Sequence, residues 1–375
     1  MIINNAKVYR NGHFESASIE FDSHIRSFSP GEGMDACGAY IIPGLIDVHT
    51  HGAMGIDASD CTAEQIHHLA QFYSDNGVTS FCFTTLTVPA DELRGAMKNI
   101  RAYERFGGEA KCTGVHLEGP FVSRGKCGAQ NPDNILKPDI ALFNELNELS
   151  GGMVRLITVA PEVEGALDFI REASKVCTVS LGHSTADYDQ AMAGFEAGAT
   201  HVTHLFNGME PFHHRKPGLV GAALTAGANV ELICDGVHIH PAMILAVHKM
   251  FGDRLIIVSD SLRCAGLCDG RYNLGGLPMI VRDGRATLLD GTIAGSSSNL
   301  LQELRNVVSY GVPLEAAVKA MTETPAKDIG VFDSIGSLET GKCADFLVLN
   351  KDLKLMATFI DGKLVNGTTD FESVK

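Results

Sequence analysis

Short runs of β-branched and other apolar residues recur along the chain, and each ends in glycine, proline or polar residues. Such runs are typical of buried β-strands. Between them lie stretches with the apolar spacing of amphipathic helices, at residues 63–77, 166–175 and 188–199. The pattern predicts eight strands, at residues 41–49, 78–86, 113–120, 154–162, 178–184, 200–207, 230–238 and 254–261.

Strand followed by helix, repeated eight times from residue 41 to about residue 330, predicts an α/β fold, a (β/α)8 TIM-type barrel. The two ends of the chain differ, because they contain only short alternating runs typical of strands. We expect these ends to pair into one small β-sandwich. The predicted organisation is therefore residues 1–42 and 336–375 for the two parts of the sandwich and 43–335 for the barrel.

Composition and charge narrow the class of protein. The chain has 375 residues, 45% of them hydrophobic and 20% charged, which excludes a disordered protein. No apolar run approaches the ~20 residues of a membrane span, and a net charge of −15 argues against binding to nucleic acid. The ten cysteines form no CxxC pair, and the first residues lack the pattern of a signal peptide. We therefore expect a cytoplasmic protein with reduced thiols and no membrane or nucleic-acid partner.

Residues that can bind metal or titrate stand at the ends of most predicted strands. Active sites of parallel barrels lie at the carboxyl ends of the strands. A single histidine there is more often structural, but a shared register at one rim is hard to obtain by accident. Histidines and carboxylates together suit zinc or ferrous iron, with a position left open for water. The residues are His49, His51, Glu118, His183, His204, His238 and Asp260.

The first and third predicted strands have the clearest local patterns. His49 and His51 alternate along a strand and therefore face the same side, as does Asp47, which we expect to orient a ligand. Glu118 precedes a Gly-Pro pair that ends its strand and exposes the carboxylate. The alternative for Glu118 is a capping acid with no role in metal binding.

Seven segments resemble one known family. Their order along the chain is similar to that of the amidohydrolase superfamily and, within it, of deacetylases that act on N-acetylated amino sugar phosphates. The resemblance covers essentially the whole chain, and its longest and most specific segment is the fourth. The segments are PGLIDVHTHG, GVHLEGPF, LGHS, HLFNGMEPFHHRKPGLVGA, DGVH, SDSLRCAG and GSLETGKCADFLVLN.

The resemblance implies a set of site residues. Glu118, His183 and His204 match the metal ligands found throughout the family, and Asp260 matches its catalytic acid/base. The chain also has both strand-one histidines, His49 and His51. The resemblance therefore implies one or two divalent ions, Zn²⁺ or Fe²⁺, and Glu118 would bridge the ions if two are bound. The positions that match substrate-binding residues are Ala129, Gln130, Asn207, Gly208, Arg215, His238, Ile293, Ala294, Gly295 and Ser296.

The resemblance also implies a substrate and a partner. The expected substrate is a small-molecule amino sugar phosphate, and the expected assembly is a homodimer in which a neighbour can contribute phosphate contacts. Residues 213–216, His-His-Arg-Lys, form a conspicuous basic run in an acidic chain. Arg215 matches the family's phosphate-binding arginine, and a guanidinium grips phosphate through paired hydrogen bonds. The alternative for this run is a solvated loop.

Two positions depart from the family pattern. Some relatives have a histidine, thought to polarise the acetyl carbonyl, where this chain has Gln130. A glutamine NH₂ group still donates a hydrogen bond, so we expect it to retain part of that role. Residues 261–266, Ser-Leu-Arg-Cys-Ala-Gly, replace an alanine-rich run.

The implied reaction is amide hydrolysis. A bound divalent ion lowers the pKa of water from ~15.7 towards ~7 and so supplies a nucleophile near neutral pH. We expect Asp260 to take the remaining proton and to deliver it to the departing amine. The metal, with His238 or Gln130, would stabilise the negative charge on the tetrahedral intermediate.

Three other functions are alternatives to deacetylation of N-acetylglucosamine 6-phosphate. Relatives that hydrolyse cyclic amides usually carry a carboxylated lysine at the end of strand four, and residues 154–162 contain no lysine. A deacetylase for the galactosamine epimer cannot be distinguished by sequence, because one inverted hydroxyl leaves no recognisable mark. An inactive scaffold or sensor is disfavoured, because Asp260 and every metal-binding position are retained.

Overall fold

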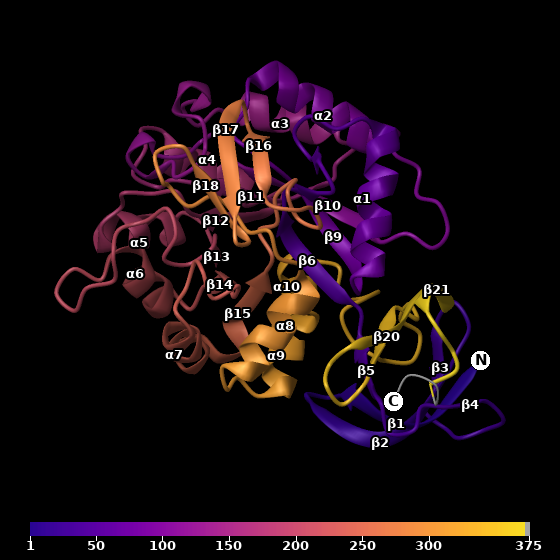
Figure 1. The fold of residues 1–375 in the computed structure, drawn as a ribbon. Coiled ribbons are helices and arrows are strands. Elements are labelled where there is room, and N and C mark those ends of the chain that lie inside the picture. Colours follow the sequence, from indigo (N-terminus) through magenta and orange to yellow (C-terminus); the bar gives the residue numbers. More distant parts are fainter. Residues whose placement is uncertain (372–375) are drawn as a thin grey trace.

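The computed structural model describes residues 1–371 and contains a barrel of eight parallel strands (Figure 1). Each strand lies within or overlaps one of the eight predicted segments, so the predicted TIM-type barrel is confirmed. Neighbouring strands pair in parallel in the order of the chain. They are β6 (Leu45–Thr50), β9 (Val78–Thr85), β10 (Lys111–Glu118), β11 (Val154–Val159), β12 (Thr178–Leu181), β13 (His201–Val202), β14 (Asn229–Ile233) and β15 (Leu255–Val258).

The barrel closes at its carboxyl end, between β6 and the chain that leaves β15. The Asp260 N–H donates to the His49 carbonyl over 2.9 Å, and the His51 N–H donates to the Ser261 carbonyl over 2.9 Å. Thr50 and Ser261 form a parallel bridge between these two hydrogen bonds. The seam that closes the barrel therefore brings the strand-one histidines directly beside Asp260.

Helices surround the barrel (Figure 1). The first begins at a capping box, in which Thr62 and Gln65 satisfy each other's backbone N–H groups. It turns Ile66, Leu69 and Tyr73 inward, at the three-to-four-residue spacing of a helix face. The helices are α1 (Ala63–Asp75), α2 (Ala90–Ala102), α3 (Ile140–Leu149), α4 (Ala166–Ala173), α5 (Tyr188–Glu196), α6 (Gly218–Ala226), α7 (Pro241–Phe251), α8 (Leu300–Ser309), α9 (Leu314–Ala320) and α10 (Glu323–Asp328).

The two ends of the chain meet in a second β-structure, seen beside the barrel in indigo and yellow in Figure 1. Hydrogen bonds join its strands into one mostly antiparallel sheet, in which β19 pairs with β5. Phe21 packs against Phe346 and Phe359 in its core, with ring centroids 4.9 and 5.4 Å apart. The limits 1–42, 43–335 and 336–375 for these units stay predictions. The strands are β1 (Ile2–Arg10), β2 (His13–Phe21), β3 (Ile25–Ser27), β4 (Met34–Asp35), β5 (Tyr40–Pro43), β19 (Phe346–Leu349), β20 (Leu355–Ile360) and β21 (Lys363–Gly367).

Where the chain first passes from the terminal sheet to the barrel, the two strands are joined by one glycine. Gly44 lies between β5 and β6, and a Cβ atom on it would come within 2.1 Å of the Thr79 hydroxyl oxygen. Its N–H donates to the Asp345 carbonyl over 3.0 Å. Because the backbone approaches β9 so closely here, only glycine fits without displacing a barrel strand.

Two antiparallel hairpin structures were not predicted. The larger one follows β15 and consists of β16 (Gly270–Leu274), β17 (Leu277–Arg282) and β18 (Arg285–Leu288). Its turns contain Gly-Gly at 275–276 and Asp-Gly at 283–284, which are favoured at tight hairpin turns. The smaller one pairs β7 (Gly52–Ala53) with β8 (Ile56–Asp57) directly after the strand-one histidines.

Within the described part of the chain, every helix is too short or too polar to cross a bilayer.

Candidate metal centre and active site

Six candidate residues from five strands or strand ends meet at one rim of the barrel. Parallel strands present their carboxyl ends on the same side, so side chains at those ends converge. Two residues belong to the end of β6 or follow it, one ends β10, and the other three each lie two residues beyond a strand. All six are buried. They are His49, His51, Glu118, His183, His204 and Asp260.

Glu118, His183 and His204 form the first group of donor atoms. Glu118 Oε1 lies 3.0 Å from His183 Nε2 and 2.9 Å from His204 Nε2, and the two nitrogens are 3.0 Å apart. His183 Nδ1 contacts the Lys126 carbonyl over 2.9 Å, which directs Nε2 toward the group. Two imidazoles and one carboxylate with converging donor atoms fit a divalent metal ion.

His49, His51 and Asp260 form the second group. His51 Nε2 lies 3.1 Å from Asp260 Oδ1 and 3.2 Å from His49 Nε2. Glu118 lies between the two groups, because its Oε2 is 3.3 Å from His51 Nε2 while its Oε1 faces the first group. This is the geometry of a carboxylate that can bridge two ions, and these residues too fit a metal.

The charges within the cluster favour ionised carboxylates. Burial opposes ionisation of Glu118, but His183, His49 and hydrogen bonds to imidazole outweigh it and hold its pKa well below the usual value. Burial likewise opposes a charge on His204, yet Glu118 and Asp260 raise its pKa to about 9. Binding of a metal ion requires neutral imidazole, so an ion would replace these protons.

Three residues of the cluster have an unusual backbone. His183, His204 and Asp260 have φ values of 46°, 27° and 46°, in the left-handed region that non-glycine residues rarely adopt. Each lies where the chain turns out of a barrel strand. Strain of this kind persists when the surrounding structure imposes it, and it concentrates at functional sites.

A cavity opens above the cluster. It is lined by five of the six clustered residues and by residues of the loops that follow the strands, including Leu274 of the hairpin β16–β17. The predicted site residues that line it are His51, Glu118, Ala129, Gln130, His183, Asn207, Gly208, His204, His238, Asp260, Ile293, Ala294 and Gly295.

Three predicted residues do not line this cavity. His49 lies beneath it and is completely buried. Ser296 turns away, because its hydroxyl donates to the Ser259 carbonyl, while its N–H donates to the Asp260 carbonyl over 2.8 Å. Arg215 lies in a separate cavity with its neighbours in the basic run.

Gln130 has a different environment from the one expected for a carbonyl-polarising group. Its Nε2 donates to Glu118 Oε2 over 2.6 Å, and its Oε1 accepts from the Thr87 N–H over 2.6 Å. The NH₂ group of Gln130 therefore contacts a candidate metal ligand, which it orients.

His238 is held by two acceptors. Its Nδ1 lies 2.7 Å from Asp235 Oδ2 and its Nε2 lies 2.7 Å from the Ala294 carbonyl oxygen. Because a carboxylate and a carbonyl both accept, both ring nitrogens carry protons in this arrangement. Burial opposes the charged ring, but Asp235 raises the pKa of His238 above its usual value. His238 therefore lines the cavity as a ring that is paired with the Asp235 carboxylate.

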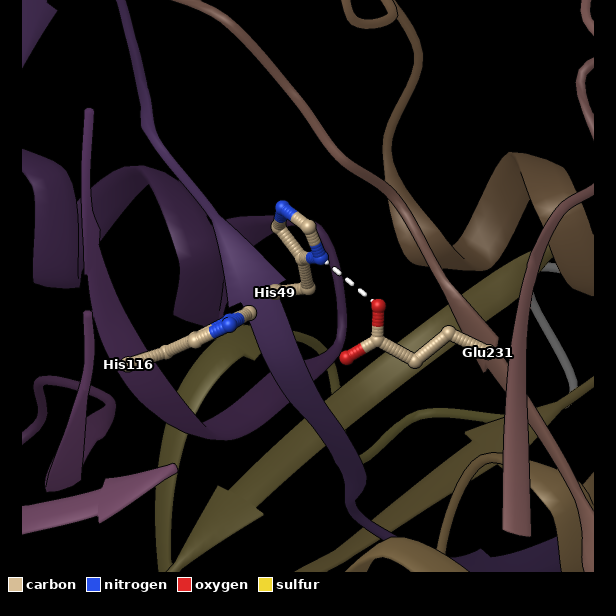
Figure 2. Close-up of side chains that lie close together, drawn as sticks. All are labelled: His49, His116 and Glu231. Carbon is tan, nitrogen blue, oxygen red and sulfur yellow. Dashed lines mark hydrogen bonds and ion pairs between the residues drawn. The ribbon is translucent and has the colours of Figure 1, made fainter. Parts of the chain in front are cut away.

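A polar group inside the barrel was not predicted from the sequence. Figure 2 shows Glu231 and His116 against His49, with Glu231 bonded to the imidazole. His201 and Asp328 continue the group on the far side of Glu231. One signal was available: Glu231 is the single charged residue in an apolar strand, and a lone buried carboxylate requires partners.

A TIM-type barrel whose rim gathers four histidines and two carboxylates is the architecture of a metal-dependent hydrolase. The chain belongs to the amidohydrolase family, whose sequence model matches residues 40–365.

Three similar proteins of this family are all named as deacetylases of N-acetylated amino sugar phosphates. An N-acetylglucosamine-6-phosphate deacetylase of Vibrio furnissii is 36% identical over 330 residues, covering 87% of this chain and 82% of the relative. An N-acetylgalactosamine-6-phosphate deacetylase of Escherichia coli O157:H7 is also 36% identical over 330 residues, covering 87% and 88%. The N-acetyl-D-glucosamine-6-phosphate deacetylase of Mycobacterium smegmatis, solved as a variant in complex with N-acetyl-D-glucosamine-6-phosphate, has a TM-score of 0.91 at 30% identity, covering 97% and 99%.

Proposed function

We propose that this protein hydrolyses the acetamide of N-acetyl-D-glucosamine 6-phosphate to D-glucosamine 6-phosphate and acetate, in the breakdown or recycling of amino sugars. One structural observation carries the proposal: Glu118 stands between two groups of imidazole donors, with Asp260 beside them at the floor of one cavity. That arrangement suits attack by water on an amide. The identity of the substrate is taken from the relatives that are named for this activity.

The residues of the chain divide the chemistry among them. A divalent ion, when bound, acidifies water and polarises the amide carbonyl. Asp260 accepts the proton of the attacking water and delivers it to the nitrogen that leaves, a role worth ~10²–10⁴ in rate. The charged ring of His238 stabilises either the negative charge that develops on the carbonyl oxygen or the negative charge that the substrate carries.

The metal content is part of the proposal. Glu118, His183 and His204 would hold one ion, and His49 and His51 would hold a second that shares Glu118. Nitrogen and carboxylate donors suit Zn²⁺ or Fe²⁺, and the proposal is one of these ions at one or both positions.

The position of Arg215 supports a dimer. The arginine lies in a cavity apart from the candidate metal centre, together with His213 and Lys216. We propose that a second copy of the chain supplies this arginine to the phosphate group of the substrate, in the homodimer predicted from the sequence. The cytoplasmic location likewise remains a proposal.

One alternative keeps specific support. The relative that acts on N-acetylgalactosamine 6-phosphate is as similar to this chain as the glucosamine relatives are. Hydrolysis of a cyclic amide has less support, because β11, the fourth barrel strand, contains no lysine for a carboxylated bridge.

One experiment tests the proposal directly. The purified protein is assayed on N-acetylglucosamine 6-phosphate, its galactosamine epimer and unphosphorylated N-acetylglucosamine, with metals quantified in the same sample. The expected result is the highest kcat/KM on the glucosamine phosphate. Preference for the epimer would select the alternative, and a metal-replete protein inactive on all three sugars would overturn both.

A further inference from the structure

We propose that Glu231 is a positioning residue that holds His49 in the orientation and tautomer needed to bind a divalent ion beside His51 and Glu118. The inference deepens the proposed function, because it names what makes the strand-one histidines a second metal site. It does not depend on the identity of the sugar.

Glu231 contacts both groups of candidate ligands. Its Oε2 lies 2.7 Å from His49 Nδ1 and accepts the His204 N–H over 3.0 Å. The carboxylate extends into the barrel from β14 and is completely buried. One oxygen atom therefore fixes a residue of the second group and the backbone of a residue of the first.

The contact determines which ring nitrogen of His49 faces the cluster. Because an ionised carboxylate only accepts hydrogen bonds, Nδ1 must carry the proton toward Glu231. The lone pair of Nε2 then points the other way, where His51 Nε2 lies 3.2 Å and Asp260 Oδ1 3.4 Å distant. Glu231 thus selects the tautomer that can bind a metal.

Glu231 is itself held from below. Its Oε1 lies 3.4 Å from His201 Nε2, and His201 Nδ1 lies 2.6 Å from Asp328 Oδ2. Asn229 donates from Nδ2 to the other Asp328 oxygen over 2.7 Å. A column of alternating charges therefore runs through the barrel interior from the end of α10 to the metal-binding rim.

His116 restricts the ring of His49 from the side. The two ring centroids lie 4.6 Å apart at 82°, and His116 Nε2 contacts the Thr158 hydroxyl over 2.8 Å. Figure 2 shows the His116 side chain beside His49. The donor atoms of His49, His116 and Glu231 are close enough to suggest an ion among themselves. The 2.7 Å separation of His49 and Glu231 is instead that of a charge-assisted hydrogen bond.

The test compares two variants, each of which removes the charge of a buried glutamate that pairs with a histidine. Glu231→Gln alters the column. The control, Glu109→Gln, alters a pair outside the barrel in which Glu109 Oε1 lies 3.0 Å from His67 Nδ1. Chelator-treated protein is titrated with Zn²⁺ in competition with a chromophoric chelator, and bound ions are counted. The unaltered protein and Glu109→Gln should bind two ions. Glu231→Gln should retain one at full affinity and bind the other 10- to 100-fold more weakly.

Asp328→Asn provides a second test if Glu231→Gln fails to fold. It loosens the column without touching either group of ligands, and it should weaken the same single ion by a smaller factor. The proposal is overturned if the unaltered protein binds only one ion, if both column variants retain two ions at full affinity, or if His116→Ala removes an ion while Glu231→Gln does not. Failure of sugar hydrolysis would overturn the proposed function but leave these ion counts interpretable.

Discussion

Gln130 donates a hydrogen bond to Glu118 over 2.6 Å, so the residue that departs from the family pattern orients a candidate metal ligand. The same amide accepts the Thr87 N–H through its oxygen. Gln130→Ala removes both contacts and leaves Glu118 Oε2 without this donor. We expect the affinity for the ion at Glu118 to fall 10- to 100-fold, as for other groups that orient ligands. Equilibrium dialysis against Zn²⁺ measures this, and an unchanged affinity together with a reduced kcat would return Gln130 to the carbonyl-polarising role.

Asp260→Asn should abolish turnover while the first ion and the substrate still bind. Asparagine preserves the shape of the side chain but cannot accept a proton at neutral pH. The expected loss in kcat is at least the ~10²–10⁴ of general acid–base catalysis. Rapid-quench kinetics on metal-replete protein measure it, and a kcat close to that of the unaltered enzyme would refute the assignment.

The two groups of ligands should differ when single residues are replaced. His183→Ala or His204→Ala should empty the first site and remove activity, since each supplies a nitrogen within about 3 Å of Glu118 Oε1. His49→Ala or His51→Ala should remove only the second ion and retain part of the activity. Metal analysis after gel filtration distinguishes these outcomes. Loss of all metal from the strand-one variants alone would mean that the main site lies there.

Arg215→Ala should weaken hydrolysis of the 6-phosphate and leave unphosphorylated N-acetylglucosamine unaffected. Loss of a charge-assisted hydrogen bond costs about 1.5–3 kcal/mol, or roughly tenfold to a hundredfold in kcat/KM, mostly through KM. Steady-state kinetics on both sugars provide the comparison.

A mixing experiment examines whether Arg215 acts across a dimer. Subunits with Arg215→Ala and subunits with Asp260→Asn each lack one function, so mixed dimers should recover part of the activity. No recovery, combined with equal losses of Arg215→Ala on both sugars, would assign the arginine to the fold.

Asp328→Asn should destabilise the protein in a pH-dependent way. Burial opposes a charge on His201, but Asp328 and Glu231 outweigh it and raise the pKa of His201 to about 10. The raised pKa stabilises the folded protein fully below pH ~6.5, the ordinary histidine value, and this stabilisation is lost as the pH rises through 10. Breaking the buried pair costs about 3–5 kcal/mol. Thermal unfolding should therefore separate the variant from the unaltered protein most at pH 6.5 and least near pH 10.

The barrel and the residues at its rim follow from local patterns in the sequence. Eight apolar runs, each closed by turn residues, predict eight strands because buried parallel strands need apolar side chains on both faces. Since parallel strands end on one side, residues at those ends had to converge, and Glu118, His183 and His204 do so. The pairing of the two chain ends followed from their alternating pattern in the same way.

The contacts between individual atoms of the site depend on the folded chain as a whole. The bridging position of Glu118, the attachment of Gln130 to it and the separate cavity of Arg215 depend on loop paths that local patterns do not encode. The hairpin sheet β16–β18 lies between the eighth strand and α8, and no strand was predicted there from the sequence. Glu231 is the clearest case. A charged residue in a strand is expected to face solvent, but the closed barrel buries this one. A buried carboxylate needs partners, and His49 and His201 lie beside Glu231 inside the closed barrel.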